Sequence, residues 1–537
     1  MQGLPPQLMG LLKPSAYPHP VTDIRLIETH ISWVILTGDF AYKLKRPVRL
    51  PFVDLSSAAR RAFFCCEEIR LNRRFAPELY LGVCEITGTG IRAAGAVGPP
   101  AIDHAVRLRQ FGEGEVLDRL LEHGRVTLPE LRNFGRHLAR LHAGLPPAPD
   151  AQAWGFPATI QAAMLRNIDE CVALAAELGT YPQLDSLRAA LAPVATAATA
   201  LFRERRRGGR VRECHGDLHA GNIVRYGGRL LAFDCLEFEP SFRWIDVAEE
   251  VAFLLMDLEV RGRHGHAAAF LSGYLDHSGD YGLCRLLRLY GVHRALVRAK
   301  VSAIEAREDT AAIPGAGRRT PGVMGGQGGA PERHRAYVDE ARRLLEAPRA
   351  RMVLMHGLSG SGKTWLATQL AAALGAVHIR SDVERKRLAG LPPQASSRSA
   401  PGEGLYSARV DAAVYGRLLE CAADVLYAGY PVIVDAAFIR RDDRERFAAL
   451  AARLGAGLCL VDCHATRQLR ERRIIARRGH DASEADLPML DHQDARAEPI
   501  GDEGYPVISA DTERENIAAD VADAVARDLL CTVQPRG

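Results

Sequence analysis

The glycine-rich string GLSGSGKT, residues 357–364, constrains the fold of this chain more than any other feature of its sequence. An apolar run at 352–356 precedes it, and an alanine- and leucine-rich stretch at 363–374 follows it. A strand, a glycine loop and a helix in this order place backbone N–H groups and a helix N-terminus around phosphate. We therefore expect a phosphate-binding βα unit here.

Further apolar runs alternate with helical segments after this unit. They lie at 376–379, 431–434 and 457–461. Alternating strands and helices favour a parallel sheet covered on both faces. Residues 349–537 are therefore predicted to form an α/β domain, a P-loop parallel α/β/α sandwich.

The loop also holds the side chains that bind nucleotide phosphates. We expect Lys363 to bridge the β- and γ-phosphates of ATP and the Thr364 hydroxyl to bind Mg²⁺. The other expected contacts come from the backbone of Gly357, Leu358, Ser359, Gly360, Ser361 and Gly362.

Carboxylates follow two of the other predicted strands. Asp382, in IRSDVERKR, is a candidate to accept the proton of a substrate hydroxyl, with Arg385 holding that substrate. The alternative is that Asp382 caps a helix beginning at Val383. Asp435 ends the apolar strand in PVIVD and is a candidate Mg²⁺ ligand, directly or through water.

Arginines are dense between residues 470 and 478. Such a run favours a closing lid that neutralises charge in the transition state and excludes water. Arg472 and Arg478 are the candidates for this role. The alternative is a solvated helix face.

A second constellation lies in the first half of the chain, in CHGDLHAGNIV. Asp217 and Asn222 are five residues apart, a spacing that lets a carboxylate face an attacking hydroxyl while an amide oxygen reaches Mg²⁺. Asp234 ends the next apolar strand and offers an anionic metal ligand.

These residues resemble the catalytic loop of the aminoglycoside phosphotransferase family, distant relatives of the protein kinases. The resemblance covers roughly residues 20–305 and implies a two-lobed protein-kinase-like fold. It implies that Asp217 is the catalytic base, that Asn222 and Asp234 bind Mg²⁺, and that His215 braces the loop. It also implies that Asp246, in FRWIDVAEEVAFLL, supports the catalytic loop.

Alternating or apolar runs at 31–36 and 40–44, joined by a Thr-Gly-Asp turn, predict a β-hairpin. Its second strand contains FAYK, at 40–43, which looks like the strand that ends in the phosphate-anchoring lysine of kinases. Lys43 is the favoured anchor, but Lys45 points the same way two residues later. The partner carboxylate is expected from the next helix, where Glu68 and Glu67 are the candidates. No G-x-G-x-x-G precedes this strand, so THIS at 29–32 would have to cover the phosphates.

The second half resembles the small P-loop kinases grouped with the zeta toxin, chloramphenicol phosphotransferase and polynucleotide kinase families, over roughly 350–530. The whole chain resembles the bacterial fusion labelled bifunctional aminoglycoside phosphotransferase/ATP-binding protein. The strings that carry this resemblance are LTGDFAYKLKRP, LNRRFAPELYL, IRSDVERKRLAG and VIVDAAFIRRDDRERF.

The predicted organisation is an α+β kinase-like domain followed by the α/β P-loop domain. The first spans 1–312, with a small strand-rich lobe at about 20–108 and a helical lobe at about 109–312. A glycine- and proline-rich segment at 313–331, expected to be flexible, and a connecting helix at 332–348 lead to the domain at 349–537.

Composition limits the partners. Sixty-nine basic and 65 acidic residues are well mixed and leave a net charge of +4, which gives little field for holding nucleic acid. Eleven cysteines without a CxxC pair fit reduced thiols in a cytoplasmic protein. No signal peptide or membrane-spanning run is found, and nothing in the sequence indicates an oligomeric state.

These features predict a cytoplasmic bifunctional phosphotransferase that uses Mg²⁺ and ATP in both domains. Each domain is expected to transfer the γ-phosphate to a hydroxyl of an unidentified small molecule. Two alternatives remain: one domain senses nucleotide and regulates the other, or the P-loop domain phosphorylates a nucleic-acid 5′-hydroxyl.

Overall fold

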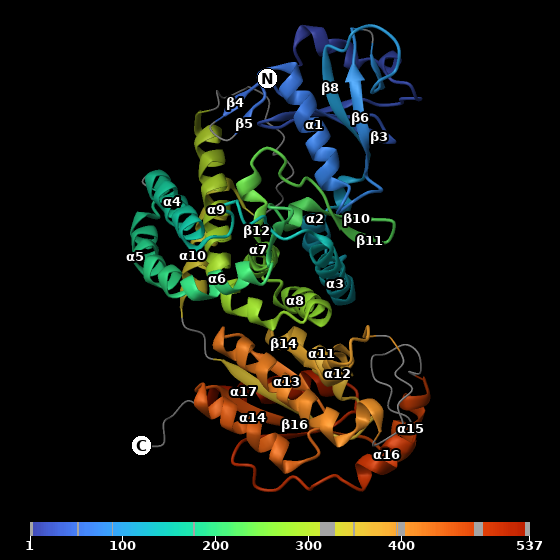
Figure 1. Cartoon of the computed structure of the whole chain (residues 1–537), viewed down its shortest axis with the longest axis vertical. Helices are drawn as coiled ribbons and strands as arrows, with labels where there is room; N and C mark the ends of the chain where they lie inside the picture. The colour runs from blue at the N-terminus through green and yellow to red at the C-terminus, as the bar shows by residue number, and fades with distance from the viewer. Residues whose placement is uncertain are drawn as a thin grey trace. The chain divides into compact units, whose positions relative to one another are not determined.

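The computed structural model describes residues 4–50, 53–88, 90–175, 178–311, 328–346, 350–393, 395, 403–476 and 487–531 (Figure 1). Its contacts divide the chain into two compact units. Unit 1 comprises Met1–Val126, Gly144–Arg261 and Gly291–Arg342. Unit 2 comprises Thr127–Ala143, Gly262–Tyr290 and Arg343–Gly537.

Unit 1 contains a six-stranded antiparallel sheet in the order β1-β2-β3-β8-β6-β7. Its strands are β1 (Arg25–Glu28), β2 (Ser32–Leu36), β3 (Phe40–Lys45), β6 (Tyr80–Ile86), β7 (Ile91–Ala93) and β8 (Asp103–Arg109). The predicted hairpin is confirmed, since β2 and β3 pair with Val34 opposite Lys43. A short pair, β4 (Arg49–Leu50) and β5 (Val53–Asp54), precedes helix α1 (Ala58–Asn72).

The two faces of this sheet are buried differently. Trp33, Tyr42 and Leu44 pack with the N-terminal segment on one face. Ala41 and its neighbours pack on the other face against α1 and the hairpin formed by β10 (Ile223–Tyr226) and β11 (Arg229–Ala232). Because strand side chains alternate, the lysines of β3 share this second face with Ala41.

The remaining elements of unit 1 are mainly helical, as predicted beyond Arg109. They are α2 (Leu117–Glu122), α4 (Pro157–Ala175), α5 (Tyr181–Ala197), α6 (Thr199–Arg207), α7 (Val247–Val260), most of α9 (Cys284–Ala311) and α10 (Ala330–Leu345), with the paired strands β9 (Val211–Glu213) and β12 (Trp244–Asp246). Most of the predicted flexible segment lies outside the described residues, and α10 is the helix expected as a connector.

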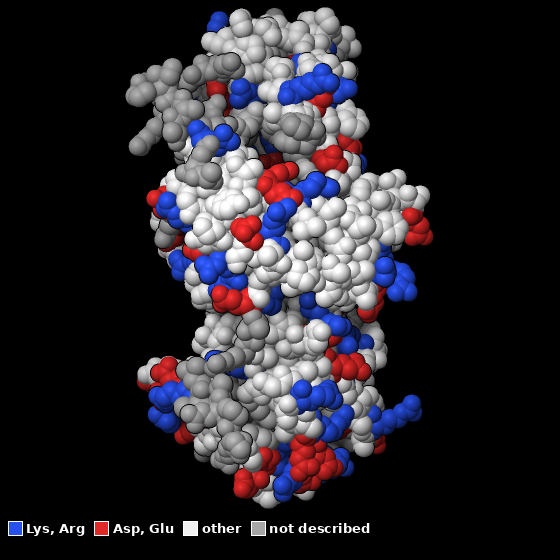
Figure 2. All heavy atoms as spheres, turned by 90° about the vertical axis from the view of Figure 1, so that its left-hand side faces the viewer, with Lys and Arg blue, Asp and Glu red and all other residues white. Residues whose placement is uncertain are grey.

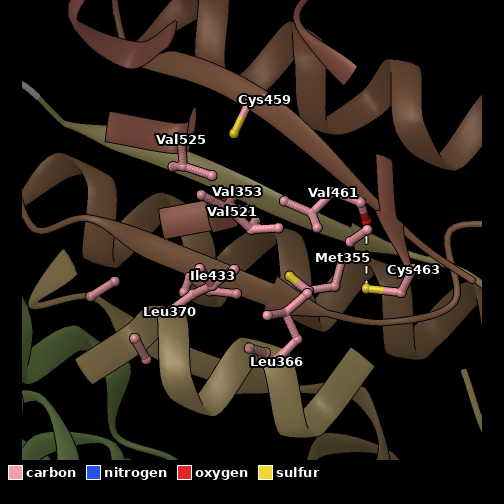
Figure 3. Close-up of a cluster of buried hydrophobic side chains, with 14 of the residues drawn as sticks. Val353, Met355, Leu366, Leu370, Ile433, Cys459, Val461, Cys463, Val521 and Val525 are labelled. Atoms are coloured by element: carbon pink, nitrogen blue, oxygen red, sulfur yellow. Dashed lines mark hydrogen bonds between the residues drawn. The ribbon is translucent and has the colours of Figure 1, made fainter. Parts of the chain in front are cut away.

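Unit 2 contains a five-stranded parallel sheet in the order β14-β15-β13-β16-β17, which confirms the predicted sheet. The strands are β13 (Arg351–His356), β14 (Val377–Arg380), β15 (Val432–Asp435), β16 (Gly457–His464) and β17 (Val507–Asp511). The helices are α11 (Lys363–Leu374), α12 (Ser381–Leu388), α13 (Ala408–Tyr427), α14 (Arg441–Arg453), α15 (Arg467–Ala476), α16 (Leu487–Asp494) and α17 (Ile517–Cys531). Figure 3 shows the apolar core between this sheet and helices α11 and α17, with Met355, Leu370 and Val525 in it.

Two helices from earlier in the chain, α3 (Leu128–Gly144) and α8 (His264–Ser278), also belong to unit 2. They pack closely, because a Cβ on Gly273 would lie 2.0 Å from the backbone oxygen of Arg132. The N–H of His378 in β14 donates to the Ser272 hydroxyl at 3.2 Å, and Arg387 donates to the carbonyl of Asp276 at 2.5 Å. The predicted boundary near residue 348 leaves these two helices in the first domain. The contacts that join them to the sheet of unit 2 connect segments far apart in sequence, which local sequence patterns do not show.

None of the helices in the described part of the chain is long and apolar enough to cross a membrane. Ten cysteines of the described chain are free thiols, and nine of them are buried. Figure 2 shows one face on which basic and acidic side chains of the described residues are interspersed rather than segregated.

Candidate active sites

The loop HGDLHAGN in unit 1 places Asp217 and Asn222 against each other. The Asn222 amide donates at 2.9 Å both to the Asp217 carboxylate and to its backbone oxygen. Burial disfavours the Asp217 carboxylate, but the charges of His219, at 3.5 Å, and Arg298 outweigh this effect and hold its pKa well below the usual range. Asp217 is therefore ionised at neutral pH.

The loop is held by a carboxylate that sequence reasoning missed. Glu250, fully buried in α7, accepts the N–H groups of His215 at 2.6 Å and Gly216 at 2.8 Å. Asp246, expected in this supporting role, instead caps α7 and pairs with Arg205 at 2.6 Å. His215 braces the loop through a 2.8 Å contact with the Phe233 carbonyl. Only the spacing of acidic residues along the apolar helix α7 could have pointed to Glu250.

Asp234 follows the hairpin β10–β11 and has a left-handed backbone with φ of 64°. Its N–H donates to the Tyr80 hydroxyl at 2.9 Å, and the next N–H, of Cys235, donates to Asn72 at 2.8 Å. Contacts from two other elements thus hold this uncommon conformation, of a kind that clusters at functional sites. The carboxylate pairs with Lys43, and although burial opposes it, this charge lowers the pKa of Asp234.

The two lysines of β3 have different surroundings. Lys43 bonds to Asp234 and lies 3.0 Å from Glu68 on α1. Lys45 has no exposed side-chain surface and bonds to Glu68 and Glu237. Lys43 is thus the lysine that contacts the candidate metal ligand Asp234, whereas Lys45 lies among buried charges. Glu67 points elsewhere and pairs with Arg70 at 2.8 Å.

These groups fit a metal and nucleotide phosphates. The Asn222 NH₂ group donates to Asp217. Its amide oxygen Oδ1 accepts no hydrogen bond from the described residues and is therefore available to a metal. Asp234 keeps 44% of its side-chain surface exposed. Amide and carboxylate oxygens are ligands that Mg²⁺ prefers, and Lys43 offers the cation for a phosphate. The turn between β1 and β2 contains Thr29, whose hydroxyl bonds to Ser32.

In unit 2 the glycine loop begins at the carboxyl end of β13, the central strand of the sheet. Gly357, Gly360 and Gly362 have φ between +79° and +130°. A Cβ on Gly357 would lie 2.3 Å from the Cys463 oxygen, and one on Gly360 would lie 2.6 Å from the Arg470 oxygen. The loop therefore requires glycine at these positions, as a phosphate cradle does.

Polar groups inside the loop are incompletely paired. Lys363 donates to the Leu358 carbonyl at 2.9 Å, and the Ser359 N–H donates to Gln493 on α16 at 2.8 Å. The Ser361 hydroxyl is buried without a hydrogen bond in the described part of the chain. Thr364 is the second residue of α11, directly after Lys363, and is half-buried. The cradle and this unpaired hydroxyl fit a bound phosphate chain, with Lys363 and Thr364 as the predicted phosphate and metal contacts.

Asp435 ends β15 opposite Met355, the last but one residue of β13. Its carboxylate lies 3.2 Å from Nε2 of the buried His378 on β14. Burial raises the pKa of Asp435, but the His378 hydrogen bond and the charges of Arg380 and Lys363 bring it down to about 2. Asp435 is thus an ionised carboxylate within the electrostatic influence of Lys363.

Asp382 is in the first turn of α12, and the residue in the cap position is Arg380. The capping alternative for Asp382 is therefore wrong, because the helix begins two residues earlier than expected. The Asp382 carboxylate makes no hydrogen bond or ion pair with any described residue. Arg385 is held by the Leu405 carbonyl and Asp411, both at 2.7 Å.

The arginines predicted to form a lid have different surroundings. Arg473 donates to the Gly360 carbonyl at 3.3 Å and to the Thr512 hydroxyl at 2.8 Å, and Thr512 in turn donates to the Ser361 carbonyl at 2.8 Å. Arg472 is exposed and makes no polar contact with any described residue. Arg478 lies outside the described residues. Thr512 and Gln493, which hold the loop from distant segments, were not found from the sequence.

Comparisons with known proteins identify two family matches along the chain. Residues 67–287 match the model of the Phosphotransferase enzyme family, and residues 352–500 match an AAA domain model. Uncharacterized proteins of Mycobacterium tuberculosis and Mycobacterium bovis are each 30% identical over 473 residues, which covers 86% of this chain and 88% of theirs.

Two solved structures are among the similar ones. A choline/ethanolamine kinase family protein from Mesorhizobium loti is 12% identical and has a TM-score of 0.34, covering 61% of this chain and 89% of its own. A gluconokinase from Sinorhizobium meliloti is 21% identical and has a TM-score of 0.26, and the match covers 35% of this chain and 96% of the gluconokinase. The two family matches and the 30% identity to mycobacterial proteins over most of both chains show the family. The chain belongs to a bacterial family that joins an aminoglycoside-phosphotransferase-like domain to a P-loop kinase-like domain.

Proposed function

We propose that the chain is a bifunctional kinase in which each domain binds Mg²⁺ and ATP and transfers the γ-phosphate to a small-molecule hydroxyl. One observation supports the proposal: in each unit a candidate base, a lysine and a candidate metal-ligand carboxylate come from different elements of the same unit, and the lysine and the metal-ligand carboxylate interact. In the first unit these are Asp217, Lys43 and Asp234. In the second they are Asp382, Lys363 and Asp435.

At the first site, Asp217 would orient the acceptor hydroxyl and take its proton as the phosphoryl group transfers. Because its pKa is low, Asp217 is a weak base and acts chiefly by holding the hydroxyl in line with the phosphate. Asn222 and Asp234 would hold Mg²⁺, which neutralises developing charge on the phosphate oxygens. Lys43, which pairs with Asp234, would bind phosphate.

At the second site, the loop amides and Lys363 would hold the phosphates, with Thr364 and Asp435 on the metal. Asp382 would receive the acceptor proton, and its freedom from helix capping supports this role. Arg473 would keep the loop in its binding shape through Gly360 and Thr512.

The test is a screen of metabolites and sugars with the full chain and ATP, read by mass spectrometry as the gain of one phosphate. Asp217→Asn and Asp382→Asn should each abolish phosphorylation of a different set of acceptors. Asp442→Asn, at an exposed position whose one ion pair among the described residues is with Arg440, is the matched control and should change neither set.

Three results would contradict the proposal or a part of it. A double variant, Asp217→Asn with Asp382→Asn, that still phosphorylates acceptors would remove both assignments. If Asp382→Asn retains every activity while Lys363→Ala lowers transfer at the first site, the P-loop domain is a nucleotide sensor. Phosphorylation of a 5′-hydroxyl oligonucleotide in preference to small molecules would change the acceptor class.

A further inference from the structure

Helix α10, expected only to connect the two domains, is built into unit 1 up to Arg342. Tyr337 and Val338 are buried, and His334 has no exposed surface. The His334 ring contacts the Thr180 hydroxyl at 2.8 Å and the Ala299 carbonyl at 2.9 Å. A segment that only connected domains would present a polar surface, whereas this helix is packed along one face.

One side chain of α10 extends toward the catalytic loop through a single intermediate. The Tyr337 hydroxyl donates to Oδ1 of Asp257 at 3.0 Å. The other oxygen, Oδ2, accepts the backbone N–H of Ala220 at 2.9 Å and the Arg261 guanidinium at 3.3 Å. Tyr337 is 4% exposed and Asp257 is 0% exposed, so water does not compete for these hydrogen bonds.

Ala220 begins the short turn Ala220–Asn222, and this turn ends at the predicted metal ligand. Asn222 in turn donates to Asp217, the predicted base. The backbone of the turn therefore sets the positions of both residues. Glu250 fixes the start of the loop, at His215 and Gly216, and Asp257 fixes its second half.

Charge around Asp257 strengthens this connection. Burial opposes its ionisation, but Arg261, His219 and Arg298 lower the pKa of Asp257 to about 2. The acceptor of the Tyr337 hydroxyl is thus a carboxylate, and hydrogen bonds to ionised acceptors are about twice as strong as neutral ones. The Arg298 guanidinium lies 5.6 Å from the Tyr337 ring, so the same cation borders both groups.

We propose that Tyr337 is a positioning residue of the first site: through Asp257 it fixes the Ala220 N–H and thereby the turn that carries Asn222 and orients Asp217. The part of this inference that concerns catalysis rests on the proposed kinase function. Its structural part does not. The consequence is that a helix beyond the glycine-rich segment completes the first active site.

The structural part is tested by hydrogen exchange on the full chain, measured for peptides covering residues 215–222. Tyr337→Phe removes only the hydroxyl and should speed exchange of the Ala220 amide by about tenfold, the size of one lost hydrogen bond to a charged group. Asp257→Asn should speed it further. Thr180→Val, which removes the His334 contact of the same helix, should leave this amide within about twofold of the wild type.

Equal exchange in Tyr337→Phe and the wild type would overturn the proposal. Equally fast exchange in Thr180→Val would overturn it too, because general packing of α10 would then explain the effect. These outcomes do not depend on any activity, so they decide the structural part even if no acceptor is phosphorylated at the first site.

The catalytic part is tested with an acceptor whose phosphorylation requires Asp217. Tyr337→Phe should lower kcat about tenfold and leave the KM for ATP within about twofold, because the Lys43 side of the site is untouched. An unchanged kcat with a raised KM would overturn the positioning role. If the wild-type chain transfers phosphate to no acceptor, the result counts against the proposed function instead.

Discussion

Replacing Lys45 by methionine tests how the first site divides work between its two lysines. Lys45 and Glu68 have no exposed side-chain surface, and Glu237 has 5%. Glu68 keeps Lys43 at 3.0 Å after the substitution, so Glu237 is the carboxylate left without its strongest counter-ion. Removing one partner of a buried ion pair costs about 3–5 kcal/mol, and we expect a loss of this size around β3 and α1.

The loss should depend on pH. Burial already raises the pKa of Glu237, and removing Lys45 raises it further. A carboxyl whose folded pKa exceeds its unfolded value of about 4.3 contributes stability at low pH that is lost as pH rises through the folded pKa. The Lys45→Met deficit should therefore be smaller at about pH 5 than at about pH 8.

Native-state hydrogen exchange of β3 and α1 peptides is the appropriate assay, because a chain of two units need not unfold in one step. The double variant Lys45→Met with Glu237→Gln should recover most of the stability. Lys43→Met should instead weaken ATP binding, measured by calorimetry, with a much smaller change in exchange. The two roles are reversed if Lys45→Met keeps full stability but loses ATP binding, while Lys43→Met loses stability but keeps ATP binding.

Three further predictions concern the loops. Glu250→Gln removes one of two charge-assisted hydrogen bonds to the catalytic loop, so Asp217-dependent turnover should fall by tenfold or more while second-site turnover is unchanged, as steady-state kinetics will show. Gly360→Ala puts a Cβ 2.6 Å from the Arg470 oxygen at φ of +79°, and calorimetry should show at least a tenfold (about 1.4 kcal/mol) loss of ATP affinity at the second site. The depressed pKa of Asp435, about 2, contributes stability that is present above the unfolded pKa and lost as pH falls through about 2. Asp435→Asn removes this titration, so acid titrations followed by circular dichroism should show a smaller loss of unit 2 structure between about pH 4 and about pH 2 than in the wild type.

Local patterns in the sequence predicted much of the fold. The strand–loop–helix order around GLSGSGKT fixed β13 and α11 within a residue, since an apolar run and a glycine loop leave few alternatives. The hairpin of β2 and β3 followed from alternation around a turn. Asp217 and Asn222 could be paired because their contact spans only five residues.

Contacts across long sequence separations were beyond such patterns. Glu250 supports the catalytic loop from 34 residues away, and Gln493 reaches the glycine loop from 134 residues away. Neither stands in a motif, because a single acceptor on one helix face has no linear signature. The choice between Lys43 and Lys45 likewise depended on Glu237, whose nearness to β3 arises only from folding.

Unit 2 is built from three separate stretches of the chain, and this limits where its gene can be divided. A gene fragment beginning near codon 349 would encode the whole parallel sheet but not α3 or α8. The product would leave the His378 N–H without Ser272 and the Arg387 guanidinium without the carbonyls of α8. It would also expose the face of α11 on which α8 packs. Recombination or subcloning at that boundary would thus yield an aggregation-prone half, a constraint that favours transmission of both halves as a single gene.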